Sequence, residues 1–157
     1  KREEILGKAR VEAENAEKRV LALAELELRK QSLKVKQDLV EETFKRALRK
    51  LAAMPAEHYA GVLADMIYNA VQDGTEEVVF SASDRARLNL DSVLDSVNKK
   101  LAQSGKTANI HLSPESGNFS GGFILKRGDV ELNNTFEVLL KMNREELEQD
   151  VLKILFG

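Results

Sequence analysis

The chain has 157 residues, which is the size of about one ordinary domain. Its composition, 43% hydrophobic and 32% charged, is typical of a chain that folds rather than of a disordered one. The absence of cysteine excludes disulfides, thiolate nucleophiles and cysteine-ligated zinc, and a net charge of −2 gives no strong attraction to nucleic acid or acidic membranes.

Residues 1–53 are predicted to form one continuous helix. No glycine lies between Gly7 and Gly61 and no proline precedes Pro55, and the segment is dominated by Ala, Leu, Glu, Lys, Arg and Gln, which favour helices. Its length would approach ~80 Å at ~1.5 Å per residue. Helices of globular domains average about 11–12 residues, so a helix of this length must pack outside the domain or stand in water.

Small and apolar residues recur along one face of this helix: Ile5, Ala9, Ala13, Ala16 and Val20, continued by Ala24. Their steps of three and four contain 11-residue relations, which predict a right-handed supercoil with a partner helix. We expect these first five residues to form the interface with that partner. A competing seven-residue pattern joins Leu26, Leu33, Val40 and Ala47 and would predict a left-handed coil, so no register is assigned to the second half. The alternative to a partner is a helix folded back on its own head.

Residues 55–157 are predicted to form a small α+β head, after a coiled-coil helix of residues 1–54 that Pro55 closes. The elements expected in chain order are a helix over 56–73, a strand over 76–81, a short helix opened by Ser81 and Asp84, a helix over 91–103, strands over 108–112, 122–126 and 130–133, and a last helix capped by Asn134 with Glu137. The apolar stripe of that last helix comprises Phe136, Leu140, Leu147, Val151 and Leu155. The head would thus hold a roughly four-stranded sheet and three to four helices.

No catalytic, cofactor-binding or metal-binding residue is predicted. Residues 105–107, GKT, lack the upstream glycine of a phosphate-binding loop and follow a helix instead of a strand, so they indicate a helix end. The glycine-rich loop 116–122 favours a tight turn into a strand. His58 and His111 lie in different elements without metal-ligand spacing, and Glu76 with Glu77 indicates the start of a strand. Acidic residues interleave with the basic pairs of the long helix, which argues against nucleic-acid binding.

Two segments carry a resemblance to a known family. Residues 121–125 read GGFIL and are followed by a charged turn, and residues 130–137 read VELNNTFE. Together with the helix rich in Ala, Glu, Lys and Arg, this order resembles the E subunit of the vacuolar/archaeal-type (V/A-type) rotary ATPases, in its bacterial or archaeal form. The resemblance covers essentially the whole chain.

This resemblance implies a non-catalytic role, without a cofactor, as half of a peripheral stalk or stator. The long helix would pair with a small helical stalk protein, the G or H subunit, in a right-handed heterodimer. The head would dock on the catalytic and non-catalytic A/B subunits. The other end would meet the collar subunit and the soluble part of the membrane stator subunit, on the cytoplasmic side of the membrane. The stalk would resist rotor torque and keep ATP chemistry coupled to ion transport.

Two other functions remain open from the sequence. Stator-like proteins of the flagellar and type III export ATPases have the same layout of a coiled coil followed by an α+β head. A small enzyme built on the head is a less favoured reading.

Overall fold

The computed structural model describes residues 1–157 and separates into two compact units, residues 1–42 and 43–157. One helix, α1 (Arg2–Ala52), makes up the first unit and enters the second, so the predicted continuous helix is confirmed. Glu3 and Glu4 in its first turn and Arg49 and Lys50 in its last turn suit the helix dipole. Every side chain from residue 1 to residue 39 is exposed.

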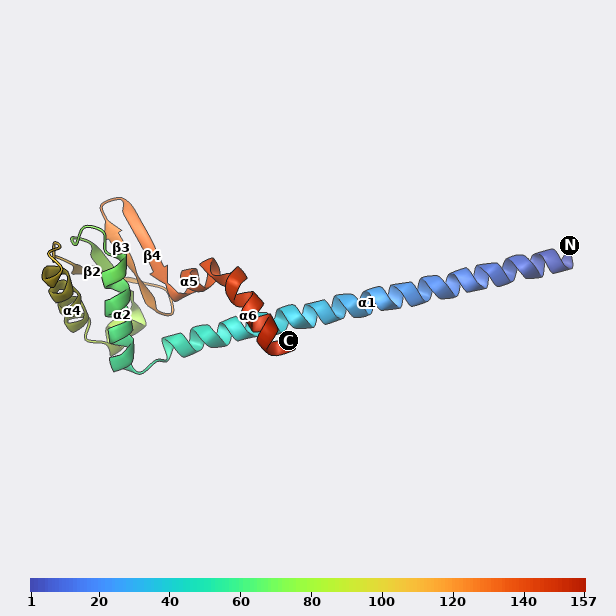
Figure 1. Cartoon of the computed structure of the whole chain (residues 1–157), viewed down its shortest axis with the longest axis horizontal. Coiled ribbons are helices and arrows are strands. Elements are labelled where there is room, and N and C mark those ends of the chain that lie inside the picture. Colours follow the sequence, from blue (N-terminus) through green and yellow to red (C-terminus); the bar gives the residue numbers. More distant parts are fainter. The chain divides into compact units, whose positions relative to one another are not determined.

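The second unit is built on a four-stranded sheet with the order β2-β1-β3-β4. Figure 1 labels β2, β3 and β4 of this sheet. Its strands are β1 (Glu77–Ser81), β2 (His111–Gly117), β3 (Gly122–Arg127) and β4 (Val130–Thr135). β1 and β2 run parallel, while β1–β3 and β3–β4 are antiparallel. The parallel pair is joined through two helices, as a crossover connection requires. The α+β fold class is therefore confirmed.

Two amphipathic helices pack with the sheet to form the core. They are α2 (Ala56–Ala70) and α4 (Leu90–Gln103), and short α3 (Ala82–Arg87) lies between β1 and α4 in the chain. The core joins apolar residues of α2 and α4 with residues of β1 and β3, among them Leu63, Ile67, Val78, Phe80, Val97, Leu101, Phe123 and Leu125. α2 ends at Ala70, three residues before the predicted end, because Val71 is extended.

The predicted single last helix is wrong, since α5 (Phe136–Met142) and α6 (Arg144–Phe156) are separate and Asn143 lies between them. The predicted cap at Asn134 is also wrong. Asn134 remains in β4, paired with Phe123, and Thr135 occupies the cap position without a side-chain cap bond. The strand pairing of Asn134 thus prevails over its capping preference.

The second strand lies further along the chain than predicted, at 111–117 instead of 108–112. Parallel pairing begins at Glu77 with His111, and the Asn98 side chain bonds both the N–H and the C=O of Ile110 at 2.9 Å. A side chain therefore satisfies the backbone that the alternating pattern assigned to a strand. Residues 113–115 form an irregularity between two pairs with β1.

Two local predictions are confirmed. The Ser81 hydroxyl accepts a hydrogen bond from the N–H of Asp84 and caps α3. Residues 105–107 end α4: Gly105 has a φ of 70°, and the N–H of Lys106 bonds the Leu101 carbonyl at 3.0 Å, as in a glycine-terminated helix. The division into a stalk of 1–54 and a head of 55–157 stays a prediction.

Candidate functional site

The first candidate surface is the row of small and apolar side chains near the start of α1. All five predicted residues are exposed, and Ile5 and Val20 keep 68% and 65% of their surfaces accessible. Helical geometry puts residues three and four apart on one face, so Ile5, Ala9, Ala13, Ala16 and Val20 line a single strip, here called the first row. Such a strip can bury apolar area only against another element. The role of this row as a partner interface stays a prediction.

The seven-residue pattern in the second half of α1 has a mixed environment. Leu26 and Leu33 are 62% and 58% exposed, whereas Val40 is buried. Val40 is the single buried residue of α1.

A buried polar cluster lies where α2, α3 and β3 meet. The Tyr59 hydroxyl donates a hydrogen bond to Asp84 Oδ2 at 3.0 Å and accepts one from the N–H of Gly122 at 2.8 Å. Arg87 places Nε 3.3 Å from Asp84 Oδ1, and its guanidinium stands 4.7 Å from the Tyr59 ring centroid. Asp84 is completely buried, and its charge is therefore compensated by hydrogen bonds and a cation, as a buried carboxylate requires.

This cluster resembles a catalytic constellation only in its residue types. Burial raises the pKa of the Tyr59 hydroxyl, and the Asp84 charge adds to the rise, so Tyr59 stays protonated as a donor at neutral pH. Both hydroxyl bonds are used within the fold, to Asp84 and to Gly122. Arg87 also approaches the Met54 carbonyl at 3.5 Å. The cluster holds together α2, α3, β3 and the segment that follows α1.

Glu76 forms a second buried carboxylate site, one residue before β1 begins at Glu77. It is 3% exposed. Its two oxygens accept hydrogen bonds at 2.8–3.0 Å from the N–H groups of Gln72, Asp73 and Gly74. The carboxylate thus accepts the hydrogen bonds of the backbone N–H groups in the turn that follows α2, where Gly74 has a φ of 84°.

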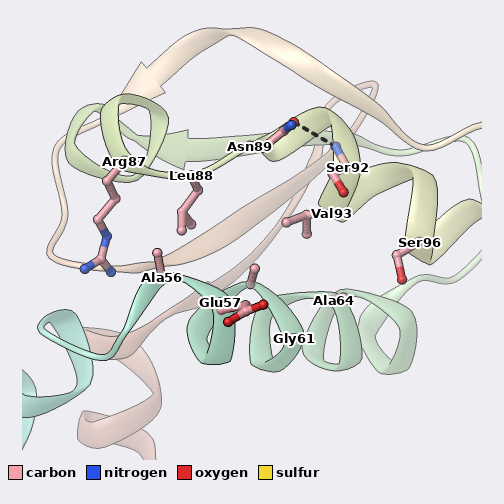
Figure 2. A pocket seen from close by; sticks show the side chains of 11 residues that line it. Ala56, Glu57, Gly61, Ala64, Arg87, Leu88, Asn89, Ser92, Val93 and Ser96 are labelled. Carbon is pink, nitrogen blue, oxygen red and sulfur yellow. Dashed lines mark hydrogen bonds between the residues drawn. The ribbon is translucent and has the colours of Figure 1, made fainter.

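An open groove of about 490 Å³ lies between α2 and α4. Figure 2 shows small side chains along α2, serines along α4, and Arg87 with Leu88 at one end. The groove is lined by Ala56, Glu57, Ala60, Gly61, Ala64, Arg87, Leu88, Asn89, Ser92, Val93 and Ser96. Its one drawn hydrogen bond is the helix cap, in which the N–H of Ser92 donates to Asn89 Oδ1 at 3.1 Å. Arg87 is already engaged by Asp84, so this groove presents no arranged pair of acid and base.

The other sequence candidates are not brought together. His58 on α2 and His111 on β2 are exposed and lie on different elements. No group of three or more His, Asp or Glu side chains is placed to hold a metal ion. None of the helices combines the length and the apolar character needed to cross a membrane.

The segment VELNNTFE performs a structural task at the join of β4 and α5. Gly122 has a φ of 85°, and a Cβ there would stand 2.4 Å from the Asn134 carbonyl oxygen. The N–H of Phe136 bonds the Gly121 carbonyl at 3.1 Å, and Glu137 Oε1 accepts from the N–H of Ser120 at 2.7 Å. Glycine is therefore required where two segments of the chain approach closely.

Comparison with known proteins decides the family. The family described as "ATP synthase (E/31 kDa) subunit" matches residues 1–156. The chain belongs to this family. Its match covers both the long helix and the head, so the E-subunit resemblance inferred from VELNNTFE and the opening helix is confirmed.

Curated relatives of this E-subunit family member come from bacteria. The chain is 45% identical over 107 residues to the V-type ATP synthase E subunit of Acetivibrio thermocellus, an alignment that covers 68% of this chain and 54% of the relative. It is 43% identical over 127 residues to the V-type proton ATPase E subunit of Thermoanaerobacter pseudethanolicus, covering 81% and 63%. With the V-type ATP synthase E subunit of Clostridium botulinum strain Langeland, identity is 34% over 93% of this chain and 73% of the relative. The chain thus spans about half to three quarters of these relatives.

Sequence reasoning missed the residues that hold the head of this E-subunit chain together. The apolar pattern places Tyr59 on the buried face of its helix, which is where it lies, but the pattern does not identify its partners. It predicts Asp84 only as a capping partner and does not single out Arg87. The spacing from Asp84 to Arg87, three residues on one short helix, is the one available signal.

Proposed function

We propose that this chain is a non-catalytic peripheral-stalk subunit of a V-type ion-translocating rotary ATPase. In this proposal α1 pairs through its first row with the small helical G or H subunit. The head docks on the A/B subunits, and the opposite end meets the collar subunit and the soluble part of the membrane stator subunit. The chain is then a peripheral part of a membrane complex, on its cytoplasmic side, and binds no nucleotide.

The observation that carries the proposal is the exposed first row on an unusually long helix. Ile5 and Val20 are each about two-thirds exposed, and the alanines between them offer no bulk that would keep a second helix away. Apolar surface of this kind is stabilised by removal from water. Membership of a family of ATP synthase subunits supports a partner within a multi-subunit complex. The head adds no arranged catalytic site, since its buried carboxylates are engaged in structural contacts.

The test is complex formation between this chain and purified G- or H-type helical subunits, followed by sedimentation to give mass and shape. We expect a 1:1 elongated heterodimer. Ala13→Glu, in the middle of the first row, should weaken pairing by about a hundredfold or more because a buried unpaired charge costs several kcal/mol.

Ala22→Glu is the matched control. It makes the same chemical change on an exposed alanine, but Ala22 follows Ala13 by nine residues, which is about 2.5 turns and therefore the opposite side of the helix. Pairing by the Ala22→Glu chain should stay close to that of the unaltered chain. Equal affinity of the Ala13→Glu chain and the unaltered chain would remove the first row from the interface.

A further inference from the structure

The middle of α1 is apolar on nearly all sides. Within the nine residues from Val20 to Leu28, only Glu25 and Glu27 are charged. Successive residues of a helix are about 100° apart, so the apolar ones are spread around its circumference instead of forming a single strip. All five large ones are more than half exposed: Val20 65%, Leu21 57%, Leu23 65%, Leu26 62% and Leu28 66%.

One partner helix cannot cover this segment. An amphipathic helix that meets one neighbour carries an apolar stripe on one side, whereas a helix that is apolar all round is enclosed. Leu26 follows Ala24 by two residues, about 200° around the axis, and so lies almost opposite the line of the first row. Leu33 stands in the same relation to Val35, which lies on the same line 11 residues after Ala24. A partner on the first row would leave Leu26 and Leu33 in water.

Ala22, Leu26 and Leu33 therefore define a second face of α1. Leu26 and Leu33 are seven residues apart, which is the repeat of a coiled coil, and Ala22 precedes Leu26 by four. The seven-residue spacing indicates a helical partner, because a lone pair of leucines is too narrow an apolar surface to lie in a membrane interface.

The rim of the second face is mostly basic. Four basic residues flank the face because each lies three or four positions from Ala22 or Leu26; they are Lys18, Arg19, Arg29 and Lys30. Glu25, three residues after Ala22, is the one carboxylate that flanks the face within residues 18–33. The rim therefore carries a clear positive excess.

Beside Val20 and Ala24, which continue the line of the first row through this segment, the charged residues at the same spacing are Glu17 and Glu27 instead. Within residues 17–30 the two faces of α1 thus differ in the sign of their flanking charge. This difference selects different partners, because opposite charges beside an apolar seam set partner choice.

We propose that the second face of α1 binds an acidic amphipathic helix of another protein, so that residues 18–33 lie between two partner helices. The inference rests on the proposed function only for the occupant of the first row. The second helix would present a seven-residue repeat of leucine-like side chains flanked by Glu or Asp. Its carboxylates would meet Lys18, Arg19, Arg29 and Lys30.

The experiment uses two labelled synthetic peptides of about four Leu-based heptads, one with Glu and one with Lys at the positions that flank the apolar seam. Binding to the full chain is measured by fluorescence anisotropy at low and high salt. The acidic peptide should bind at least tenfold more tightly than the basic one, and high salt should weaken it. The double variant Leu26→Gln/Leu33→Gln should reduce its affinity at least tenfold, and Arg29→Gln/Lys30→Gln should reduce both affinity and salt dependence.

Val20→Gln is the matched control on the first row and should bind the acidic peptide like the unaltered chain. Gln favours helices about as well as Leu, so none of these variants removes the helix. If Val20→Gln abolishes binding and the double variant does not, the peptide occupies the first row and the inference is overturned, while the pairing test with Ala13→Glu stands unaffected. Equal binding of both peptides, or of neither, also overturns it. The inference is also overturned if the chain associates with itself and the double variant Leu26→Gln/Leu33→Gln does not. It is likewise overturned if the chain co-floats with anionic vesicles and this binding requires Leu26 and Leu33.

Discussion

Replacing Tyr59 with Phe removes one hydroxyl from the centre of the head and leaves the ring in place. The hydroxyl bonds the N–H of Gly122 at 2.8 Å and Asp84 Oδ2 at 3.0 Å. Both sites are buried, and Phe keeps the ring contact with Phe136, whose centroid lies 5.7 Å away. The change therefore isolates the hydrogen bonds from the packing.

The expected loss follows from the two groups left behind. A buried donor or acceptor without a partner costs about 1–3 kcal/mol, so the Gly122 N–H and the weakened Asp84 site together predict a loss of about 2–4 kcal/mol. Arg87 still contacts Asp84 at 3.3 Å in the variant. The loss of stability should therefore not exceed the lower part of the range that is typical when a buried ion pair is broken. Such a loss is a large fraction of the ~5–15 kcal/mol that stabilises a domain.

Hydrogen exchange of the β3 amides measures this loss, because these amides report opening of the head and not fraying of α1. Tyr68→Phe is the control: Tyr68 also bonds through its hydroxyl, to Ser104 Oγ at 2.8 Å, but at an exposed site where water replaces the bond. We expect that control to change the free energy of opening by less than about 1 kcal/mol. Equal, small effects of the two substitutions would refute the role given to the buried cluster.

Three further predictions concern the head. Gly122→Ala should destabilise the head by more than about 1 kcal/mol, because the φ of 85° disfavours a side chain and the added Cβ would stand 2.4 Å from the Asn134 oxygen. Gly61→Ala, at an exposed position of α2 with nothing within 4 Å, should stabilise the head by about 0.5–1 kcal/mol. The urea midpoints of the two variants measure both changes. Glu76→Gln should cost about 1.5–3 kcal/mol, because the amide has one acceptor oxygen where the carboxylate has two for the N–H groups of Gln72, Asp73 and Gly74. Glu77→Gln on the adjoining strand should cost little by the same urea measurement. Hydrogen bonds from Thr75, with help from Arg127, lower the pKa of Asp73 to about 2, so its contribution to stability is present above pH 3.8 and is lost as pH falls toward 2; NMR titration of its carboxyl should give this pKa, and Arg127→Gln should raise it.

Regular elements of this chain follow well from its sequence, and the contacts that define the head do not. The glycine-free, proline-free run that precedes Pro55 is enough to predict α1, because local propensity decides a helix with few long-range contacts. The cap formed by Ser81 is likewise local, and its prediction is confirmed. Asn134 carries the same local preference, but pairing with β3 decides its conformation.

The positions of buried charges depend on segments far apart in the chain. Glu76 is followed by Glu77, and the sequence predicts this pair only as the start of a strand. Only the turn after α2, which presents three N–H groups toward it, makes Glu76 a buried residue. The Tyr59 cluster similarly depends on Gly122, which lies 63 residues away along the chain. Spacing alone cannot supply such partners.

The partner surfaces fall between these cases. Periodicity identifies the first row of α1, and the exposure of Ile5 and Val20 agrees with an unfilled face. The second face carries only two leucines, so the pattern is weak without the exposure values of Leu26 and Leu33. The basic residues that flank this face distinguish it only by comparison with Glu17 and Glu27, which flank Val20 and Ala24 on the other side.

The most direct test of the stator role is the ratio of ions transported to ATP hydrolysed in a reconstituted V-type complex that contains either the unaltered chain or the Ala13→Glu chain. We predict that the Ala13→Glu complex continues to hydrolyse ATP but loses most ion transport, while the complex with the unaltered chain remains coupled. An unchanged ratio in the Ala13→Glu complex, with the chain still assembled through α1, would contradict the stator role, as would loss of ATP hydrolysis itself on the catalytic subunits.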